Sequence, residues 1–94
     1  MHTAKLIEKE QIPSLKFSSF EVLNTPEEKL ERRANIEKAM LIGNSSKSKS
    51  KIFFMTEEGL MEVETTVWAA TDDSVTLKGG VIIPLHCITK TELI

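Results

Sequence analysis

The feature that most constrains the fold is the glycine pair Gly79-Gly80, which stands between two short runs of alternating residues. These runs cover residues 74–78 and 81–85, and each places apolar side chains at every second position. Glycine adopts positive φ at little steric cost, and a tight hairpin turn requires that conformation. The pattern therefore predicts two antiparallel strands joined by a two-residue turn.

Further strands are predicted on both sides of this hairpin. Residues 52–55 form a continuous apolar run, which is typical of a strand covered on both faces. Residues 61–70 alternate between apolar and polar side chains, as in one long strand with a single buried face. Pro84 limits how far the strand after the glycine pair can continue, because proline donates no backbone hydrogen bond. A short turn after Pro84 allows a last strand from Ile88. We predict that five antiparallel strands over residues 51–94 close a small barrel.

A helix is predicted over residues 26–42 by signals at both of its ends. Thr25 and Glu28 have capping-box spacing, and Pro26 takes the first helical position, where its missing N–H costs nothing. Gly43 suits a left-handed cap at the other end.

One side of this helix is predicted to cover an open end or edge of the sheet. Charged residues interrupt the apolar stripe, so we expect partial burial. Arg32 and Arg33 are assigned to a solvated face, and the Ser- and Lys-rich residues 44–50 to a flexible linker. The predicted apolar stripe consists of Leu30, Ala34, Ile36, Met40 and Leu41.

Residues 1–24 are predicted to form an N-terminal arm ahead of a single domain, residues 25–94. We expect the arm to be partly ordered, with room for a short helix that ends before Pro13. Phe17 and Phe20 lie in this arm among serines. Two interpretations stay open: they clip the arm onto the chain's own core, or they dock it on a second copy.

The hairpin at Gly79-Gly80, the passage Ile83-Pro84-Leu85 before a short turn, and the helix from Thr25 to Gly43 together support a comparison. Residues 25–94 resemble the Sm-like and SH3-like small barrels, and also short uncharacterised bacterial proteins with a helix-plus-barrel layout. The resemblance implies an α+β, mainly β fold with a five-stranded barrel. The Asp and Asn loop pattern by which Sm proteins bind RNA has no clear counterpart here, so that function does not transfer.

Composition narrows the class of protein. A chain of 94 residues suits one domain, and no apolar run approaches the ~20 residues of a membrane helix. Charged residues interrupt any apolar secretion signal, and Cys87 is the only cysteine, so we expect a cytoplasmic protein without intrachain disulfides. The net charge is −2, but residues 51–94 hold three lysines against seven acidic residues.

No set of residues predicts catalysis. His86 and Cys87 are adjacent, and adjacent side chains on a strand point to opposite faces, so they cannot pair as base and nucleophile there. Glu62 and Glu64 share a strand face, where solvent exposure is the simpler interpretation. The sequence predicts no enzyme, cofactor, metal ion or small-molecule substrate.

Two function classes remain. In the first, the chain is a non-enzymatic interaction module that self-associates or docks a protein partner through Phe17, Phe20 and Trp68. In the second, it binds RNA or single-stranded nucleic acid, with Trp68 or Phe54 stacking on bases and lysines on phosphates. The acidic β half opposes phosphate binding and favours the first class. The lysines of the second class are Lys47, Lys49 and Lys51.

Overall fold

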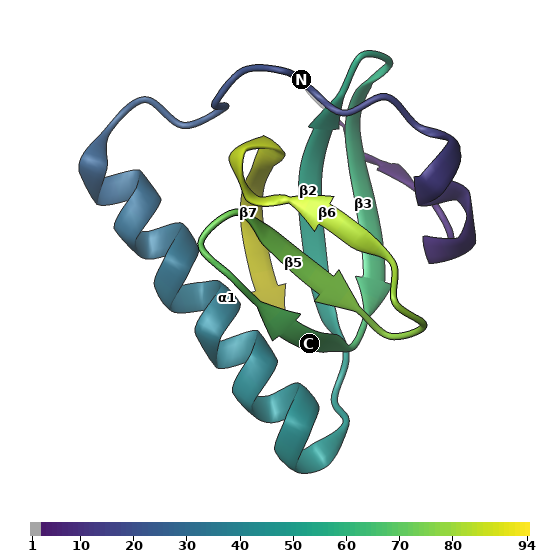
Figure 1. The fold of residues 1–94 in the computed structure, drawn as a ribbon, viewed down its shortest axis with the longest axis vertical. Coiled ribbons are helices and arrows are strands. Elements are labelled where there is room, and N and C mark those ends of the chain that lie inside the picture. The colour runs from purple at the N-terminus through teal and green to yellow at the C-terminus, as the bar shows by residue number, and fades with distance from the viewer. Residues whose placement is uncertain (1–2) are drawn as a thin grey trace.

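A computed structural model describes residues 3–94, so the first two residues of the predicted arm lie outside the described part. The chain is an α+β protein with one long helix and two sheets (Figure 1). In chain order the elements are β1 (Lys5–Leu6), the 3-10 helix η1 (Lys9–Ser14), α1 (Pro26–Ser46), β2 (Ser50–Thr56), β3 (Gly59–Thr65), β4 (Val67–Ala70), β5 (Ser74–Leu77), β6 (Ile82–Pro84), the 3-10 helix η2 (Leu85–Cys87) and β7 (Ile88–Leu93).

The strands of residues 3–94 form two separate sheets, with orders β1-β3-β2-β7 and β4-β5-β6, and they do not form a closed barrel. The predicted single strand over residues 61–70 is wrong, because it breaks at Thr66 into β3 and β4. The carbonyl of Thr66 accepts a hydrogen bond from the Lys78 N–H at 2.9 Å. Thr66 is thus bonded to a residue of the β5–β6 turn and not to a neighbouring strand.

β2 and β3 form a regular hairpin that pairs Ser50 with Thr65 and Thr56 with Gly59. The prediction that β2 is covered on both faces is wrong, since burial alternates along it. Ile52 and Phe54 are fully buried, whereas Phe53 faces outward beneath the Lys90 ammonium, 5.4 Å from its ring centre.

The predicted β5–β6 hairpin is present, but its turn has three residues, not two. The Leu77 N–H donates to the Val81 carbonyl at 2.7 Å, which leaves Lys78, Gly79 and Gly80 in the loop. Both glycines have positive φ, 89° and 85°, as the sequence predicts. The loop gains a residue because the Gly80 N–H turns back to the Leu77 carbonyl at 2.9 Å.

The start of α1 is as predicted, and its end is not. Thr25 and Glu28 form a full capping box around Pro26. The helix continues through Gly43 to Ser46 and ends at Lys47, which takes the left-handed conformation with φ 57°. Gly43 serves a different purpose: a Cβ there would lie 2.4 Å from the Val67 carbonyl oxygen, so glycine permits close approach of α1 and β4. The predicted linker over 44–50 is thereby reduced to the residues between Ser46 and Ser50.

The buried face of α1 also differs from the prediction. Leu30 and Leu41 are 71% and 67% exposed. Ala34 is also exposed, whereas Ile36 of the predicted stripe is buried and Met40 packs against the core. The buried face is therefore rotated from the predicted one, and on it α1 contacts β4 and β7 (Figure 1). The residues of this buried stripe are Arg32, Ile36, Ala39 and Gly43.

The arm packs against the sheets. β1 pairs in parallel with β3 instead of forming the expected helix, and η1 follows with Pro13 inside it. Ile7 and Ile12 are buried in the same core as Phe54. Among the helices of the described residues, none has the length and apolarity to cross a membrane.

Candidate functional site

Trp68 occupies the irregular position of β4. Val67 pairs with Leu77 and Ala69 with Thr76, so Trp68 is the extra residue of a bulge. The bulge turns both Trp68 and Ala69 outward, and Trp68 is 48% exposed. Trp68 therefore lies at the surface, because the strand loses its alternation at this point.

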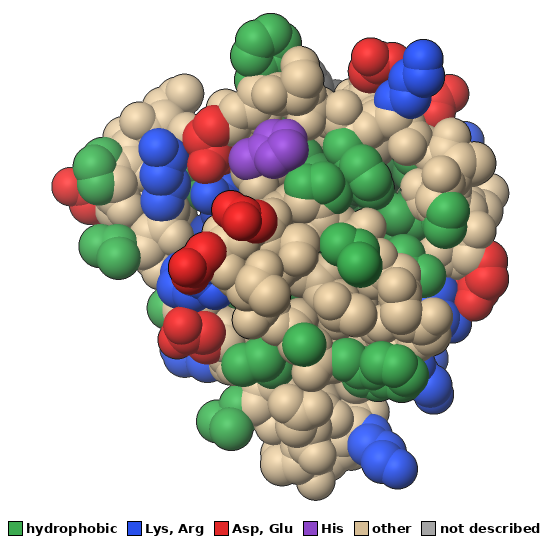
Figure 2. All heavy atoms as spheres, viewed as in Figure 1, with side chains coloured by type: hydrophobic (Ala, Val, Ile, Leu, Met, Phe, Trp, Pro, Cys, Tyr) green, Lys and Arg blue, Asp and Glu red, His purple; other side chains and the backbone are tan. Residues whose placement is uncertain are grey.

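The sheet around Trp68 presents an uncharged outer face. No residue of β4, β5 or β6 is charged. Ala69, Thr76 and Ile82 lie in one row across the three strands, and Ile82 is exposed. Figure 2 shows hydrophobic side chains over this face, with acidic side chains gathered toward α1 and a basic side chain near its lower end. This face is suited to contact a partially apolar ligand.

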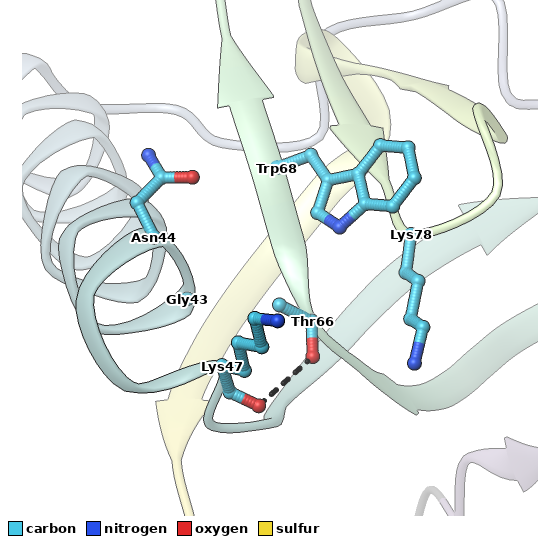
Figure 3. A pocket seen from close by; sticks show the side chains of 6 residues that line it. All are labelled: Gly43, Asn44, Lys47, Thr66, Trp68 and Lys78. Atoms are coloured by element: carbon cyan, nitrogen blue, oxygen red, sulfur yellow. Dashed lines mark hydrogen bonds between the residues drawn. The ribbon is translucent and has the colours of Figure 1, made fainter.

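A hollow of about 260 Å³ opens beside Trp68, between the end of α1 and the β5–β6 turn. Lys47 and Lys78 reach it from these two elements, and the indole nitrogen of Trp68 points toward the space between them (Figure 3). The Thr66 hydroxyl donates to the Lys47 carbonyl at 3.4 Å, which ties the end of α1 to the sheet. We call this site the Trp68 hollow; its lining is Gly43, Asn44, Lys47, Thr66, Trp68 and Lys78.

The Trp68 hollow is rich in hydrogen-bond donors. Within residues 3–94, neither Lys47 nor Lys78 forms an ion pair with a carboxylate, and the Trp68 indole N–H has no acceptor. Two ammonium groups and an indole N–H beside an aromatic ring can bind an anion together with an apolar or aromatic group.

The three lysines of the nucleic-acid hypothesis do not form one surface. Lys47 lines the Trp68 hollow, whereas Lys49 lies near Leu6 and Glu64. Lys51 is 3.8 Å from Glu62 and 3.9 Å from Glu64, so its charge is already balanced. Lys78 is not among the residues predicted from the sequence. It lines the Trp68 hollow together with Lys47 because the fold brings the β5–β6 turn to the end of α1.

The two phenylalanines of the arm have different positions. Phe17 packs on the core, with its ring centre 6.0 Å from that of Phe54, as the first interpretation predicts. Phe20 is 78% exposed and lines a shallow hollow with Met55 and Glu57. Only Phe20 is thus free for the docking role that the second interpretation predicts for both.

An ion pair between the buried Arg32 and the partly exposed Glu21 fixes the segment after Phe20. Both Glu21 carboxylate oxygens lie 2.7 Å from the Arg32 guanidinium, which also donates to the Ile88 carbonyl at 3.1 Å. The Arg32 partner lowers the pKa of Glu21 to about 2. Arg32 is 6% exposed, so its assignment to a solvated face is wrong; its partner stands in the arm, beyond the reach of a helix-periodicity argument.

His86 and Cys87 do not form a catalytic pair. The His86 Nε2 lies 2.6 Å from the Ser18 carbonyl oxygen, so it donates there, and the Cys87 thiol donates to the Pro84 carbonyl at 3.1 Å. Burial raises the pKa of Cys87 to about 12, which leaves the thiol protonated at neutral pH. In residues 3–94, no three His, Cys, Asp or Glu side chains gather as metal ligands would.

Comparison with family models, curated proteins and solved structures finds no match to this chain.

Proposed function

We propose that this chain is a non-enzymatic interaction module of the cytoplasm, and that the Trp68 hollow is its binding site. The observation that carries the proposal is the position of Trp68: the chain's one tryptophan is half exposed on a bulge in an uncharged sheet. A side chain of this size contributes strongly to binding when a partner covers it, and tryptophan is enriched among residues that dominate interfaces.

The chemistry of the hollow favours a protein ligand with an aromatic or aliphatic side chain next to carboxylates. The apolar group would cover the indole, and the carboxylates would lie against Lys47 and Lys78. The surrounding uncharged sheet offers further area for a peptide but no further charge for a phosphate backbone.

We propose that the two sheets are an open variant of the SH3-like or Sm-like topology that the sequence resembles. The support for this proposal is that β3 and β4 are separated by Thr66 alone, so they can be regarded as one bent strand shared by the two sheets. β2 pairs with both β3 and β7, and η2 joins β6 to β7 in a single short turn.

Single-stranded nucleic acid is the second candidate ligand. The observation in its favour is that Lys47 and Lys78 flank the exposed indole, an arrangement that allows a base to stack while a phosphate is neutralised. Two lysines provide little phosphate affinity, and the acidic composition of residues 51–94 opposes it.

A fluorescence titration distinguishes the two ligands, because Trp68 is the only tryptophan and its emission reports on this site alone. The probes are a short peptide with Phe between glutamates and an oligothymidylate, each added at low and high salt. We expect the peptide to shift the Trp68 emission to shorter wavelength. Weak affinity, with Kd on the order of 0.1–1 mM, is sufficient.

The matched variants are the double change Lys47→Glu with Lys78→Glu, and Lys16→Glu as a control on an exposed site outside the hollow. The double variant should lose the response and the control should retain it. A response to oligothymidylate alone that weakens steeply with salt would establish the second candidate instead. No response to either probe would overturn both.

A further inference from the structure

We infer that the ligand of the Trp68 hollow is a second copy of this chain, which inserts Phe20 in a head-to-tail arrangement. The inference rests on the proposed function, since it names the partner of that same site. It is carried by a second surface whose charge and aromatic side chain complement those of the hollow.

This second surface consists of Phe20 with Glu57 and Glu58, and we call it the Phe20 knob. Phe20 projects from the arm with 78% of its surface exposed, and Glu57 borders it across a shallow hollow. Glu57 and Glu58 form the exposed turn between β2 and β3, and neither is in an ion pair within residues 3–94. The knob therefore presents an aromatic side chain next to the Glu57 carboxylate, and Glu58 follows Glu57 in the same exposed turn.

The knob is held in place and is not a loose end. The Ser18 N–H donates to the Met55 carbonyl at 3.1 Å, and the Glu57 N–H donates to the Lys16 carbonyl at 2.9 Å. On the other side of Phe20, the paired Glu21 and Arg32 anchor the arm to α1. A fixed knob loses little conformational freedom when it binds.

The knob and the hollow complement one another in charge and in chemistry. The carboxylates of Glu57 and Glu58 match the ammonium groups of Lys47 and Lys78, and the Phe20 ring matches the exposed indole of Trp68. Opposite charges next to an aromatic contact fix the orientation as well as the affinity of a small interface.

One copy cannot fill its own hollow. The β2–β3 turn and the stretch of the arm that leads into α1 lie at the top of the molecule in Figure 1, whereas the end of α1 lies at the bottom. A contact between two different surfaces is heterologous, so each added copy leaves one knob and one hollow unoccupied. Association therefore continues into rings or short filaments as the protein concentration rises.

The test uses two full-length variants that each lack one half of the contact, Phe20→Ala and Trp68→Ala. The solution mass of each is measured by light scattering at about 1 mM protein, since a contact made by a few side chains is weak. We expect each variant alone to have the 10.6 kDa mass of one chain. Mixed in equal amounts, they should form a species of twice that mass, because the intact Phe20 of one variant fits the intact hollow of the other.

This mixed species should contain two chains and grow no further. As a control, Trp68→Ala is mixed with the double variant Lys47→Glu and Lys78→Glu, and this mixture should stay monomeric because both partners lack an intact hollow. Both altered aromatic residues are exposed, so loss of folding does not explain a negative result. The Trp68 emission of Phe20→Ala checks that this variant is folded. A monomeric mixture, or association of either variant alone, would overturn the inference. Binding of the Phe-glutamate peptide with a monomeric mixture would leave the proposed function intact.

Discussion

At the scale of single residues, Arg32 connects three segments that are far apart in sequence. Its guanidinium holds Glu21 of the arm and the Ile88 carbonyl at the start of β7, while its own backbone belongs to α1. A buried guanidinium is costly unless its donors are paired, so loss of the carboxylate leaves an uncompensated charge. This one pair thus couples the position of the arm to the packing of the helix.

Replacing Glu21 by Gln should lower the free energy of unfolding at pH 7 by about 1–2 kcal/mol, less than for a fully buried pair because Glu21 is partly exposed. The folded chain lowers the pKa of Glu21 from 4.5 to about 2, so it binds this proton less readily than the unfolded chain. The stabilisation is therefore complete above about pH 4.5 and is lost as the pH falls toward 2.

Urea unfolding followed by circular dichroism between pH 2 and 7 measures this effect. The wild-type chain should lose stability through that window, and Glu21→Gln should lose less there. Glu31→Gln, an exposed change on the same helix, is the control and should follow the wild type. Equal acid sensitivity of Glu21→Gln and the wild type would contradict the role of this pair.

At the scale of elements, the contact between α1 and β4 positions the Trp68 hollow. Gly43 allows the helix to approach the Val67 carbonyl, and the helix then continues to Lys47, which lines the hollow. The distance between helix and strand thus sets where the Lys47 ammonium lies relative to the indole.

Replacing Gly43 by Ala should destabilise the chain by about 1–3 kcal/mol, because the added Cβ would lie 2.4 Å from a backbone oxygen that cannot move aside cheaply. The same change should also alter the Trp68 emission, since the helix must shift away from β4. Ser45→Ala, on the exposed side of the same helical turn, is the control and should be neutral or slightly stabilising. A Gly43→Ala variant as stable as wild type, with unchanged emission, would refute this role.

The sequence predicts the start of α1 better than its end or its buried face. The capping box at Thr25 is local, so its residues alone determine it. The end depends on the approach of β4 at Gly43, and the buried face depends on Glu21, which neutralises Arg32. Neither partner lies within the helix, so helical periodicity selects the exposed leucines instead.

At the scale of the whole molecule, the arm belongs to the core that it covers. Ile12 is fully buried, and Ile7 packs in the same cluster beside the parallel β1–β3 pair. Removal of residues 1–23 would therefore expose the core as well as remove Phe20. For this reason single substitutions test the Phe20 knob better than truncation does.

Replacing Ile12 by Ala should cost about 2–5 kcal/mol, as expected when a fully buried side chain leaves a cavity. Leu6→Ala, in the same arm but on an exposed side chain, is the matched control and should change the stability by less than about 0.5 kcal/mol. Thermal unfolding of both variants measures the difference. Similar melting temperatures for the two would show that the arm contributes nothing to the core.

The general α+β class and the positions of the hairpin turns follow from local patterns, as at Gly79 and Gly80. The division into two sheets does not, because the break at Thr66 depends on hydrogen bonds from Lys78 and to Lys47, both distant in sequence. The candidate site likewise depends on contacts between residues that are distant in sequence. Trp68 and Lys47 can be selected from the sequence, but Lys78 joins them only through the folded topology.

The most direct test of the Trp68 hollow as the binding site is a ¹⁵N NMR titration of the full chain with the Phe-glutamate peptide. The indole N–H of Trp68 gives a signal of its own, since the chain has one tryptophan. We predict that this signal and the amide signals of Lys47, Thr66 and Lys78 shift most, while those of Phe53 and Lys90 on the other sheet stay in place. Shifts centred on Phe53 and Lys90, or none at all, would contradict the account.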